Sequence, residues 1–145
     1  MAQTPIHQGF IFAAGFGTRM RPLTDDKPKP MVEINGKPMI DHILDDFKNH
    51  GIAKIVINTH YKADVLHRHL QNKNGPSIQI SHEPELLHTG GGLKHALPHF
   101  NGEDFFAVNG DSYLESEPNK SPLMRMQEMW NCLLYTSDAA DEGGS

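Results

Sequence analysis

A short apolar run that ends in a glycine-rich turn constrains the fold of this chain more than any other feature. Residues 9–14 are continuously apolar, and Gly15-Phe16-Gly17-Thr18-Arg19 follows them directly. A short apolar run bounded by turn residues is typical of a strand that is buried on both faces. Glycines let the backbone come close to a ligand and turn its N–H groups towards a phosphate. This segment therefore predicts a buried strand that leads into a phosphate-binding loop.

The rest of the chain alternates between helix-like and strand-like segments. The residue patterns predict helices over 38–47, 63–70 and 92–99, and strands over 52–58, 77–81 and 105–109. Residues 15–37 are expected to form a long ordered loop, and loops of that length are usually functional. Because strands alternate with helices, we expect an α/β fold with a Rossmann-like, doubly wound, mainly parallel sheet and helices on both faces.

The composition excludes several classes of protein. The chain of 145 residues suffices for one domain, and its net charge of -5 provides no general basic field for nucleic acid. No apolar run approaches the roughly 20 residues of a membrane span, and the first residues do not resemble a secretory signal. Cys132 is the only cysteine, which excludes a disulfide framework and a cysteine-based metal site. We therefore expect a cytoplasmic protein that binds neither nucleic acid nor membranes.

The alternating pattern stops near Glu115. We interpret residues 1–115 as the N-terminal nucleotide-binding part of a domain, and residues 116–131 as the start of a remainder that is cut short, so that the fold is incomplete. Residues 132–145 match the translation of a transposon-end sequencing adapter, and we interpret them as a non-native tail. A natural acidic tail is the alternative, and recovery of the same codons from DNA sequenced without that adapter would support it.

Three unusual segments follow predicted strands: residues 15–29, 83–92 and 110–111. Ligands of doubly wound sheets bind at the carboxyl ends of strands, so we expect these segments to line one cleft. The first segment lacks the Gly-Lys-Ser/Thr of a Walker A loop. Met20 also stands where a dinucleotide-binding fingerprint has its third small residue. Taken alone, the two glycines could instead form only a tight turn at the end of the strand, without binding a ligand.

The glycine-rich loop belongs to a longer and more specific string. Gly-x-Gly-Thr-Arg-Met-Arg-Pro-Leu-Thr spans residues 15–24, Lys-Pro-Lys-Pro-Met spans 27–31, and Gly-Lys-Pro-Met-Ile spans 36–40. Over residues 8 to about 115, the chain resembles the sugar-phosphate nucleotidyltransferase family. The Thr-Gly-Gly-Gly at 89–92 is similar to the N-acetylmuramate-1-phosphate uridylyltransferase branch, within a group that includes mannose-1-phosphate guanylyltransferases. Members join a sugar-1-phosphate to a nucleoside triphosphate and release pyrophosphate.

The resemblance implies a set of site residues. Arg19 would hold the departing phosphates and Lys29 would stabilise charge at the reacting phosphate, so both are expected to be catalytic. Asn109 would face the sugar-phosphate substrate, and Asp111 would bind Mg²⁺, a hard cation that suits a carboxylate. The residues expected to bind the nucleotide are Ala13, Ala14, Gly15, Gly17, Thr18, Arg19, Thr89 and Gly90.

Each of these roles has a simpler alternative. Lys29 resembles many loop lysines that are merely solvated, with Lys27 as a nearby example. An aspartate after a glycine, as at Asp111, often closes an Asx turn. The segment 83–92 is also compatible with a glycine-rich helix entry that contacts no base. The second metal ligand of the family lies further along than this chain extends.

The ten histidines do not form a metal-binding motif. His67 and His69 lie two positions apart on a predicted helix, so their side chains point away from each other. We expect most histidines to lie at the surface, and only His60 and His88 follow strands near the predicted cleft.

The predicted function is transfer of a nucleoside monophosphate, with UTP favoured, to a sugar-1-phosphate. Guanylyl or thymidylyl transfer is the alternative within the same family. A non-catalytic module that binds nucleotides or sugar phosphates is an alternative of another class. A dinucleotide-dependent oxidoreductase is a third, which Met20 disfavours. This chain alone is expected to bind nucleotide weakly and not to turn over.

Overall fold

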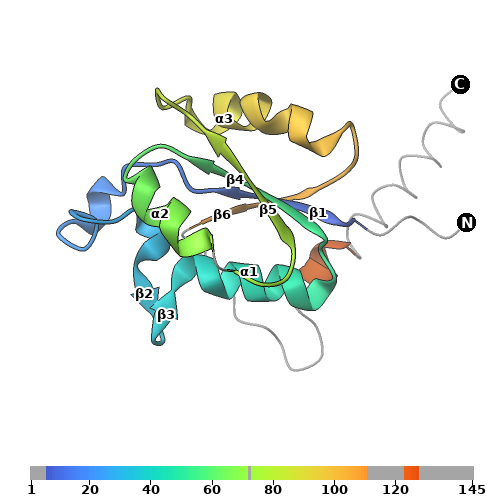
Figure 1. Ribbon diagram of the computed structural model, residues 1–145, viewed down its shortest axis with the longest axis horizontal. Helices are drawn as coiled ribbons and strands as arrows, with labels where there is room; N and C mark the ends of the chain where they lie inside the picture. The colour runs from blue at the N-terminus through green and yellow to red at the C-terminus, as the bar shows by residue number, and fades with distance from the viewer. Residues whose placement is uncertain (1–5, 72, 111–122, 128–145) are drawn as a thin grey trace, which may run out of the picture.

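A four-stranded parallel sheet forms the centre of the protein. The computed structural model describes residues 6–71, 73–110 and 123–127. The sheet contains β1 (Gln8–Phe12), β4 (Lys54–Thr59), β5 (Ser77–His82) and β6 (Phe106–Asn109), in the order β5-β4-β1-β6. All three neighbouring pairs are parallel. The expected parallel α/β sheet is thus confirmed (Figure 1).

Helices cover both faces of the sheet, as expected (Figure 1). Successive residues of a strand point to opposite faces, so each central strand contributes to two cores. Ile11 packs on one face with residues of α1 (Met39–His50) and α2 (Ala63–Leu70). Phe10 packs on the other face with residues of α3 (His88–Ala96) and the following turn η3 (Leu97–Phe100). The sheet is therefore anchored from both sides, which fixes the positions of its strand ends.

Two of the helices agree closely with the predictions. α1 begins directly after Pro38 and ends at Gly51, whose φ of 88° is a left-handed conformation that glycine adopts readily. α2 has the predicted bounds. The third helix begins earlier than predicted, at His88, so residues 89–92 form its first turns instead of a loop. Glycine has low helix propensity, and tertiary contacts override it here.

The segment between β1 and α1 is ordered by short elements. It contains the 3₁₀ turns η1 (Thr18–Met20) and η2 (Lys29–Met31), and β2 (Glu33–Ile34) pairs antiparallel with β3 (Lys37–Pro38). The prediction of a single long loop missed these elements because each is only two or three residues long.

β6 is less buried than its sequence suggests. It lies at the edge of the described sheet, next to β1, and its Ala107 and Asn109 are exposed. An apolar run does not reveal whether a strand has one neighbour or two, so the sequence could not predict this edge position.

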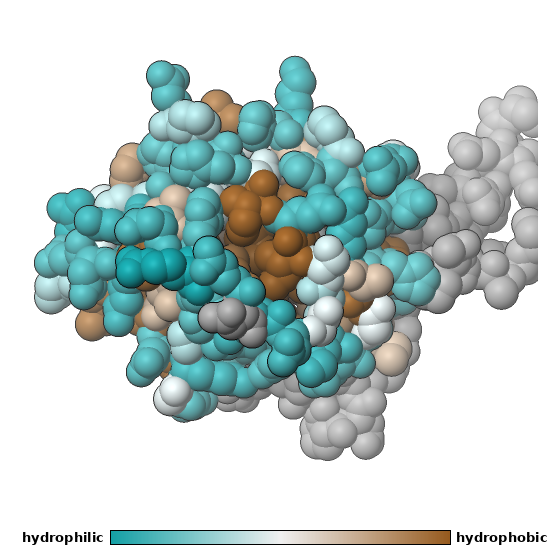
Figure 2. Space-filling model, viewed as in Figure 1, coloured by the Kyte–Doolittle hydropathy of each residue, from teal (hydrophilic) through white to brown (hydrophobic). Residues whose placement is uncertain are grey.

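The face shown in Figure 2 is mostly hydrophilic, with an apolar patch near its middle, in the region where Figure 1 shows β5. Within the described residues, no helix is long and apolar enough to cross a membrane. Residues 123–127 are helical. Asp111 and the predicted tail at 132–145 lie outside the described residues.

Candidate functional site

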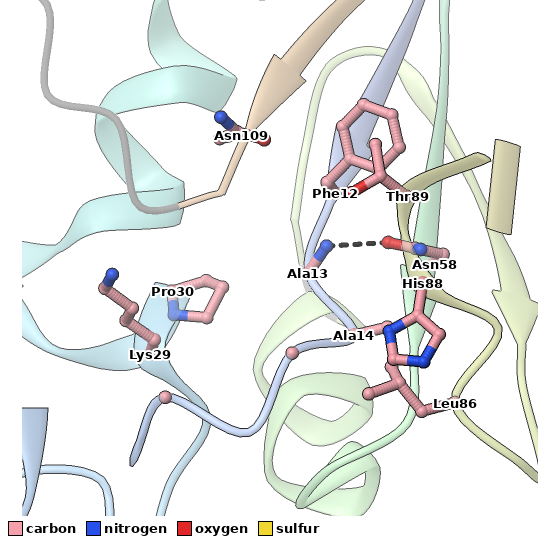
Figure 3. Close-up of a pocket in the computed structure, with 12 residues that line it drawn as sticks. Phe12, Ala13, Ala14, Lys29, Pro30, Asn58, Leu86, His88, Thr89 and Asn109 are labelled. Atoms are coloured by element: carbon pink, nitrogen blue, oxygen red, sulfur yellow. Dashed lines mark hydrogen bonds between the residues drawn. The ribbon is translucent and has the colours of Figure 1, made fainter. Parts of the chain in front are cut away.

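A cavity of about 270 Å³ opens at the carboxyl ends of the strands. From β1 the chain builds the sheet to one side through β4 and β5, and β6 then joins β1 on the other side. Ligands of open α/β sheets bind at such a reversal of strand order. The cavity is lined by Phe12, Ala13, Ala14, Gly15, Gly17, Lys29, Pro30, Asn58, Leu86, His88, Thr89 and Asn109 (Figure 3).

The cavity brings together most of the residues that the sequence singled out. Seven of them line it, namely Ala13, Ala14, Gly15, Gly17, Lys29, Thr89 and Asn109. In Figure 3, Lys29 lies on one side of the chain exit at Ala13, and Thr89 lies on the other side. Segments that are far apart in sequence therefore face each other across one space.

Three predicted residues lie outside the cavity lining. Thr18 and Arg19 belong to η1 and are exposed, and Gly90 is exposed on α3. Their predicted contacts with a nucleotide remain predictions. Among the residues that the structure describes, no three His, Cys, Asp or Glu side chains gather to hold a metal ion. The predicted metal ligand Asp111 is not among those residues.

The glycine-rich loop is held from behind by Thr24. Gly17 has a φ of 66°, and a Cβ added to it would lie 2.9 Å from Thr24 Cγ2 and 3.2 Å from Lys29 Cβ. Thr24 is buried, and its hydroxyl donates a hydrogen bond of 2.7 Å to the carbonyl of Gly17. A Cβ at Gly15 would meet no atom within 4 Å. The loop is therefore fixed at Gly17 and open at Gly15, where a ligand has room to approach.

Lys29 starts a tight turn that packs against the end of β6. The amide of Val32 donates to the carbonyl of Lys29 at 3.0 Å, which closes η2. Pro30 is buried, and its Cγ would lie 2.9 Å from a Cβ added to Gly110. The Gly110 amide also donates to the Phe12 carbonyl at 2.8 Å. Because Gly110 has no side chain, Pro30 packs closely against it, and this contact holds the Lys29 turn beside the cavity.

Two polar residues at the cavity, Asn58 in its lining and Glu83 next to Asn58, were not predicted as site residues. The amide of Ala13 donates to Asn58 Oδ1 at 2.6 Å, and Asn58 Nδ2 donates to Glu83 Oε2 at 2.9 Å. Asn58 is 2% exposed and Glu83 is fully buried. The sequence offered one signal for this pair: a polar residue stands at the end of the predicted strand 52–58, and another stands in the loop after the predicted strand 77–81. Their partners lie 45 and 25 residues away, and the residue pattern does not reveal such pairings.

The histidines serve different local roles. His88 lines the cavity, and the Nδ1 of His60 lies 2.6 Å from the carbonyl oxygen of Glu83. His67 Nε2 and His82 Nδ1 lie 2.9 and 3.0 Å from the hydroxyl oxygen of the buried Thr59. Burial, and then the nearby His82, lower the pKa of His67. His67 thus favours its neutral form in the folded protein.

His69 pairs with Asp41, on a different side of α2 from the partner of His67. Its Nε2 lies 2.6 Å from Asp41 Oδ1, and Lys73 Nζ lies 3.0 Å from Asp41 Oδ2. Burial alone would raise the pKa of Asp41, but the hydrogen bonds from His69 and Lys73 outweigh it and lower that pKa. The two histidines point to different partners, as their spacing predicted.

The chain is similar to known proteins in sequence and in structure. A solved structure, "HddC from Yersinia pseudotuberculosis complexed with GMP-PN", is similar with a TM-score of 0.68 and 33% identity over 76% of this chain and 50% of that one. N-acetylmuramate alpha-1-phosphate uridylyltransferase of Caulobacter vibrioides is 44% identical over 77% of this chain and 48% of its own length. The protein of that name in Neisseria meningitidis is 40% identical over 72% and 46%.

This chain therefore spans about half the length of these curated relatives. The family described as Nucleotidyl transferase matches residues 8–129, which is most of the chain. The match includes the glycine-rich loop, the Lys29 turn and every described segment that lines the cavity. The chain belongs to the nucleotidyl transferase family.

Proposed function

We propose that the protein containing this chain transfers a nucleoside monophosphate from a nucleoside triphosphate, with UTP favoured, to a sugar-1-phosphate. The observation that carries the proposal is the cavity at the strand reversal, which gathers the glycine-rich loop, Lys29 and Thr89. The two uridylyltransferases that are 44% and 40% identical act, by their names, on N-acetylmuramate 1-phosphate. This sugar phosphate is the first substrate to test.

The reaction needs positioning and charge neutralisation more than covalent chemistry. An oxygen of the sugar-1-phosphate attacks the α-phosphorus, the bond to the bridging oxygen breaks, and pyrophosphate leaves with that oxygen. Backbone N–H groups around Gly15 would bind the phosphates, because this part of the loop is open. Lys29 lies on the other side of Ala13 from Thr89 (Figure 3). Its positive charge would neutralise the charge that develops at the reacting phosphate. Arg19, exposed on η1, would hold the departing phosphates.

Residues 83–92, which we call the base segment because Thr89 and Gly90 are expected to bind the nucleotide there, support a pyrimidine. Guanine presents an N2–H₂ donor that requires an acceptor in the pocket. The segment carries two carboxylates, Glu83 and Glu85. Glu83 is fully buried, and its oxygens already accept from Asn58 and from the amide of Leu87, whereas Glu85 does not line the cavity. Thr89 lines the cavity, and its hydroxyl can donate to a uracil carbonyl oxygen or accept from the uracil N3–H. Guanylyl transfer remains the second candidate, because the similar Yersinia structure was solved with GMP-PN.

We also propose Mg²⁺ as the cofactor. Asp111, two residues after the cavity-lining Asn109, would bind the ion, while Asn109 would face the sugar phosphate. Amide and carboxylate oxygens are the ligands that Mg²⁺ accepts in proteins. When bound, the ion would neutralise phosphate charge. A cytoplasmic location is a further part of the proposal, supported by the single cysteine of the sequence.

Pyrophosphate release tests the proposal directly. A full-length enzyme that carries this segment is incubated with Mg²⁺, N-acetylmuramate 1-phosphate and, in turn, UTP, GTP, dTTP and CTP. We expect the fastest release with UTP. Faster release with GTP would move the protein to the guanylyl branch. Tight nucleotide binding without release, with a panel of sugar phosphates, would favour the non-catalytic binding module.

A further inference from the structure

We propose that Asn58 and Glu83 are positioning residues that tie the phosphate loop to the base segment and so set the distance between the two halves of the nucleotide site. This inference rests on the proposed function. We call the Asn58 and Glu83 side chains the buried clamp. They connect Ala13 at the exit of β1 to Leu87 at the start of α3.

The clamp is a continuous chain of hydrogen bonds. Ala13 donates its N–H to Asn58 Oδ1 at 2.6 Å, Asn58 donates from Nδ2 to Glu83 Oε2 at 2.9 Å, and Leu87 donates its N–H to Glu83 Oε1 at 3.1 Å. Figure 3 shows the first of these bonds beside the cavity. Every link is buried or partly buried, so water competes little for these groups.

The two ends of the clamp lie next to predicted ligand-binding residues. Ala13 directly precedes Ala14 and Gly15, and Leu87 directly precedes His88 and Thr89, which line the opposite part of the cavity. A shift of either end would move its neighbours relative to the other half of a bound nucleotide. Misplacement by about 1 Å can reduce catalysis by about 100-fold.

Gly92 shows how closely α3 packs on the clamp. A Cβ added there would lie 2.7 Å from Glu83 Oε2 and 2.9 Å from Asn58 Nδ2. A Cβ at Gly90 would meet no atom within 4 Å. Gly92 and Gly90 therefore have different roles: Gly92 makes room for the clamp, and Gly90 leaves space at the surface of the helix.

The direction of the hydrogen bonds explains why an amide faces a carboxylate. Asn58 must accept from one side and donate to the other, which an aspartate cannot do. Asn58→Asp would place two carboxylates together, and Glu83→Gln would place an NH₂ donor against either the donor of Asn58 or that of Leu87. The double variant N58D/E83Q restores every bond, because the glutamine donates to the aspartate and still accepts from Leu87.

The test is a rescue experiment on a full-length enzyme that carries this segment. The variants are N58D, E83Q and N58D/E83Q, with Asn49→Asp and Glu33→Gln as matched controls at exposed positions outside the cleft segments. Affinities for UTP, tripolyphosphate and uridine are measured by calorimetry, and kcat and KM by pyrophosphate release. UTP spans both halves of the site, whereas each of the other probes occupies one half.

We expect each single variant to lose about tenfold or more in UTP affinity. Affinities for tripolyphosphate and uridine should change by less than about twofold, and the double variant should recover most of the UTP affinity. Controls should match the wild type. Equal losses for all three probes, or a double variant as weak as the singles, would overturn the clamp. If a single variant does not fold, the double variant decides by its UTP affinity and its kcat/KM.

The outcome separates the clamp from the proposed function. A wild type that binds UTP but releases no pyrophosphate with any sugar phosphate would reject the proposed transfer, and the affinities would still judge the clamp. A wild type that transfers nucleotide while the double variant shows no recovery would reject the clamp alone. A wild type that binds no nucleotide would reject both.

Discussion

The hydroxyl of Thr24 donates a 2.7 Å hydrogen bond to the carbonyl of Gly17, and its methyl group occupies the space that a side chain at Gly17 would need. The phosphate loop is thus shaped by a residue that lies behind it and does not line the cavity. A side chain at position 17 should therefore disturb the loop by more than the backbone strain that any non-glycine residue has in the left-handed conformation.

Gly17→Ala tests this fit, with Gly36→Ala as its control. Both glycines have positive φ, 66° and 84°, but only an alanine at Gly17 would meet Thr24 and Lys29. Both variants should lose about 1–2 kcal/mol of stability from backbone strain. G17A should lose more, and its KM for UTP should rise by at least about tenfold. Urea denaturation and steady-state kinetics measure the two effects, and similar kinetics for both variants would contradict the prediction.

Lys29→Ala should lower kcat by about 100-fold or more without loss of the fold, because it removes a positive charge from the cavity. Lys27→Ala is the matched control: it removes a lysine that lies two residues before the turn and does not line the cavity. Circular dichroism checks the fold, and pyrophosphate release measures turnover. Near-normal turnover of K29A would remove Lys29 from its proposed role.

Gly92→Ala should destabilise the protein by about 1–3 kcal/mol, because its methyl group would overlap the Glu83 carboxylate and the Asn58 amide. Gly90→Ala should instead be neutral or stabilising by up to about 1 kcal/mol, because it improves helix propensity in open space. Chemical denaturation of the two variants gives the comparison. Equal stabilities would mean that α3 can shift away from the clamp at little cost.

The stability of the protein should fall as the pH falls from 7 towards 5. Burial and the nearby His82 lower the pKa of His67, so the unfolded state binds more protons than the folded state below a pH of about 6.5. The contribution of neutral His67 is therefore present above that pH and is lost as the pH falls through this range. His50, whose pKa is also lowered by burial, acts in the same direction.

His67→Gln should reduce this pH dependence, because glutamine can still hydrogen-bond to the Thr59 hydroxyl but does not titrate. Denaturation at pH 7.5, 6.5 and 5.5 measures the slope for both proteins. His95→Gln, at an exposed position on α3, provides the control. Identical slopes for H67Q and the wild type would show that other groups dominate the acid response.

The sequence predicted the elements that depend on local patterns. The apolar run before Gly15, the face of α1 and the glycine at position 51 are all local signals, and the structure agrees with them. The start of α3 at His88 was not predictable in this way, because the amide of Leu87 bonds to Glu83 outside the helix. The edge position of β6 likewise depends on which strands pair, which local patterns do not specify.

The same distinction applies to the site. Its glycines and Lys29 were recognisable from a motif, and seven of the predicted residues line the cavity. Asn58 was not singled out because a lone asparagine at a strand end has many ordinary uses. Its importance appears only when β1 and β4 pair and bring its oxygen to the amide of Ala13.

The central position of β1 has a consequence for how the site is assembled during folding. Gly9 of this strand pairs with Ile55 on one side and with Phe106 on the other, so neither partner is close in the chain. Such distant pairings carry a loop-closure entropy and slow the folding of parallel sheets. The cavity therefore cannot form until β6, the last strand of the described sheet along the chain, has paired with β1. Nucleotide binding should accordingly appear late in refolding, together with the pairing of β6.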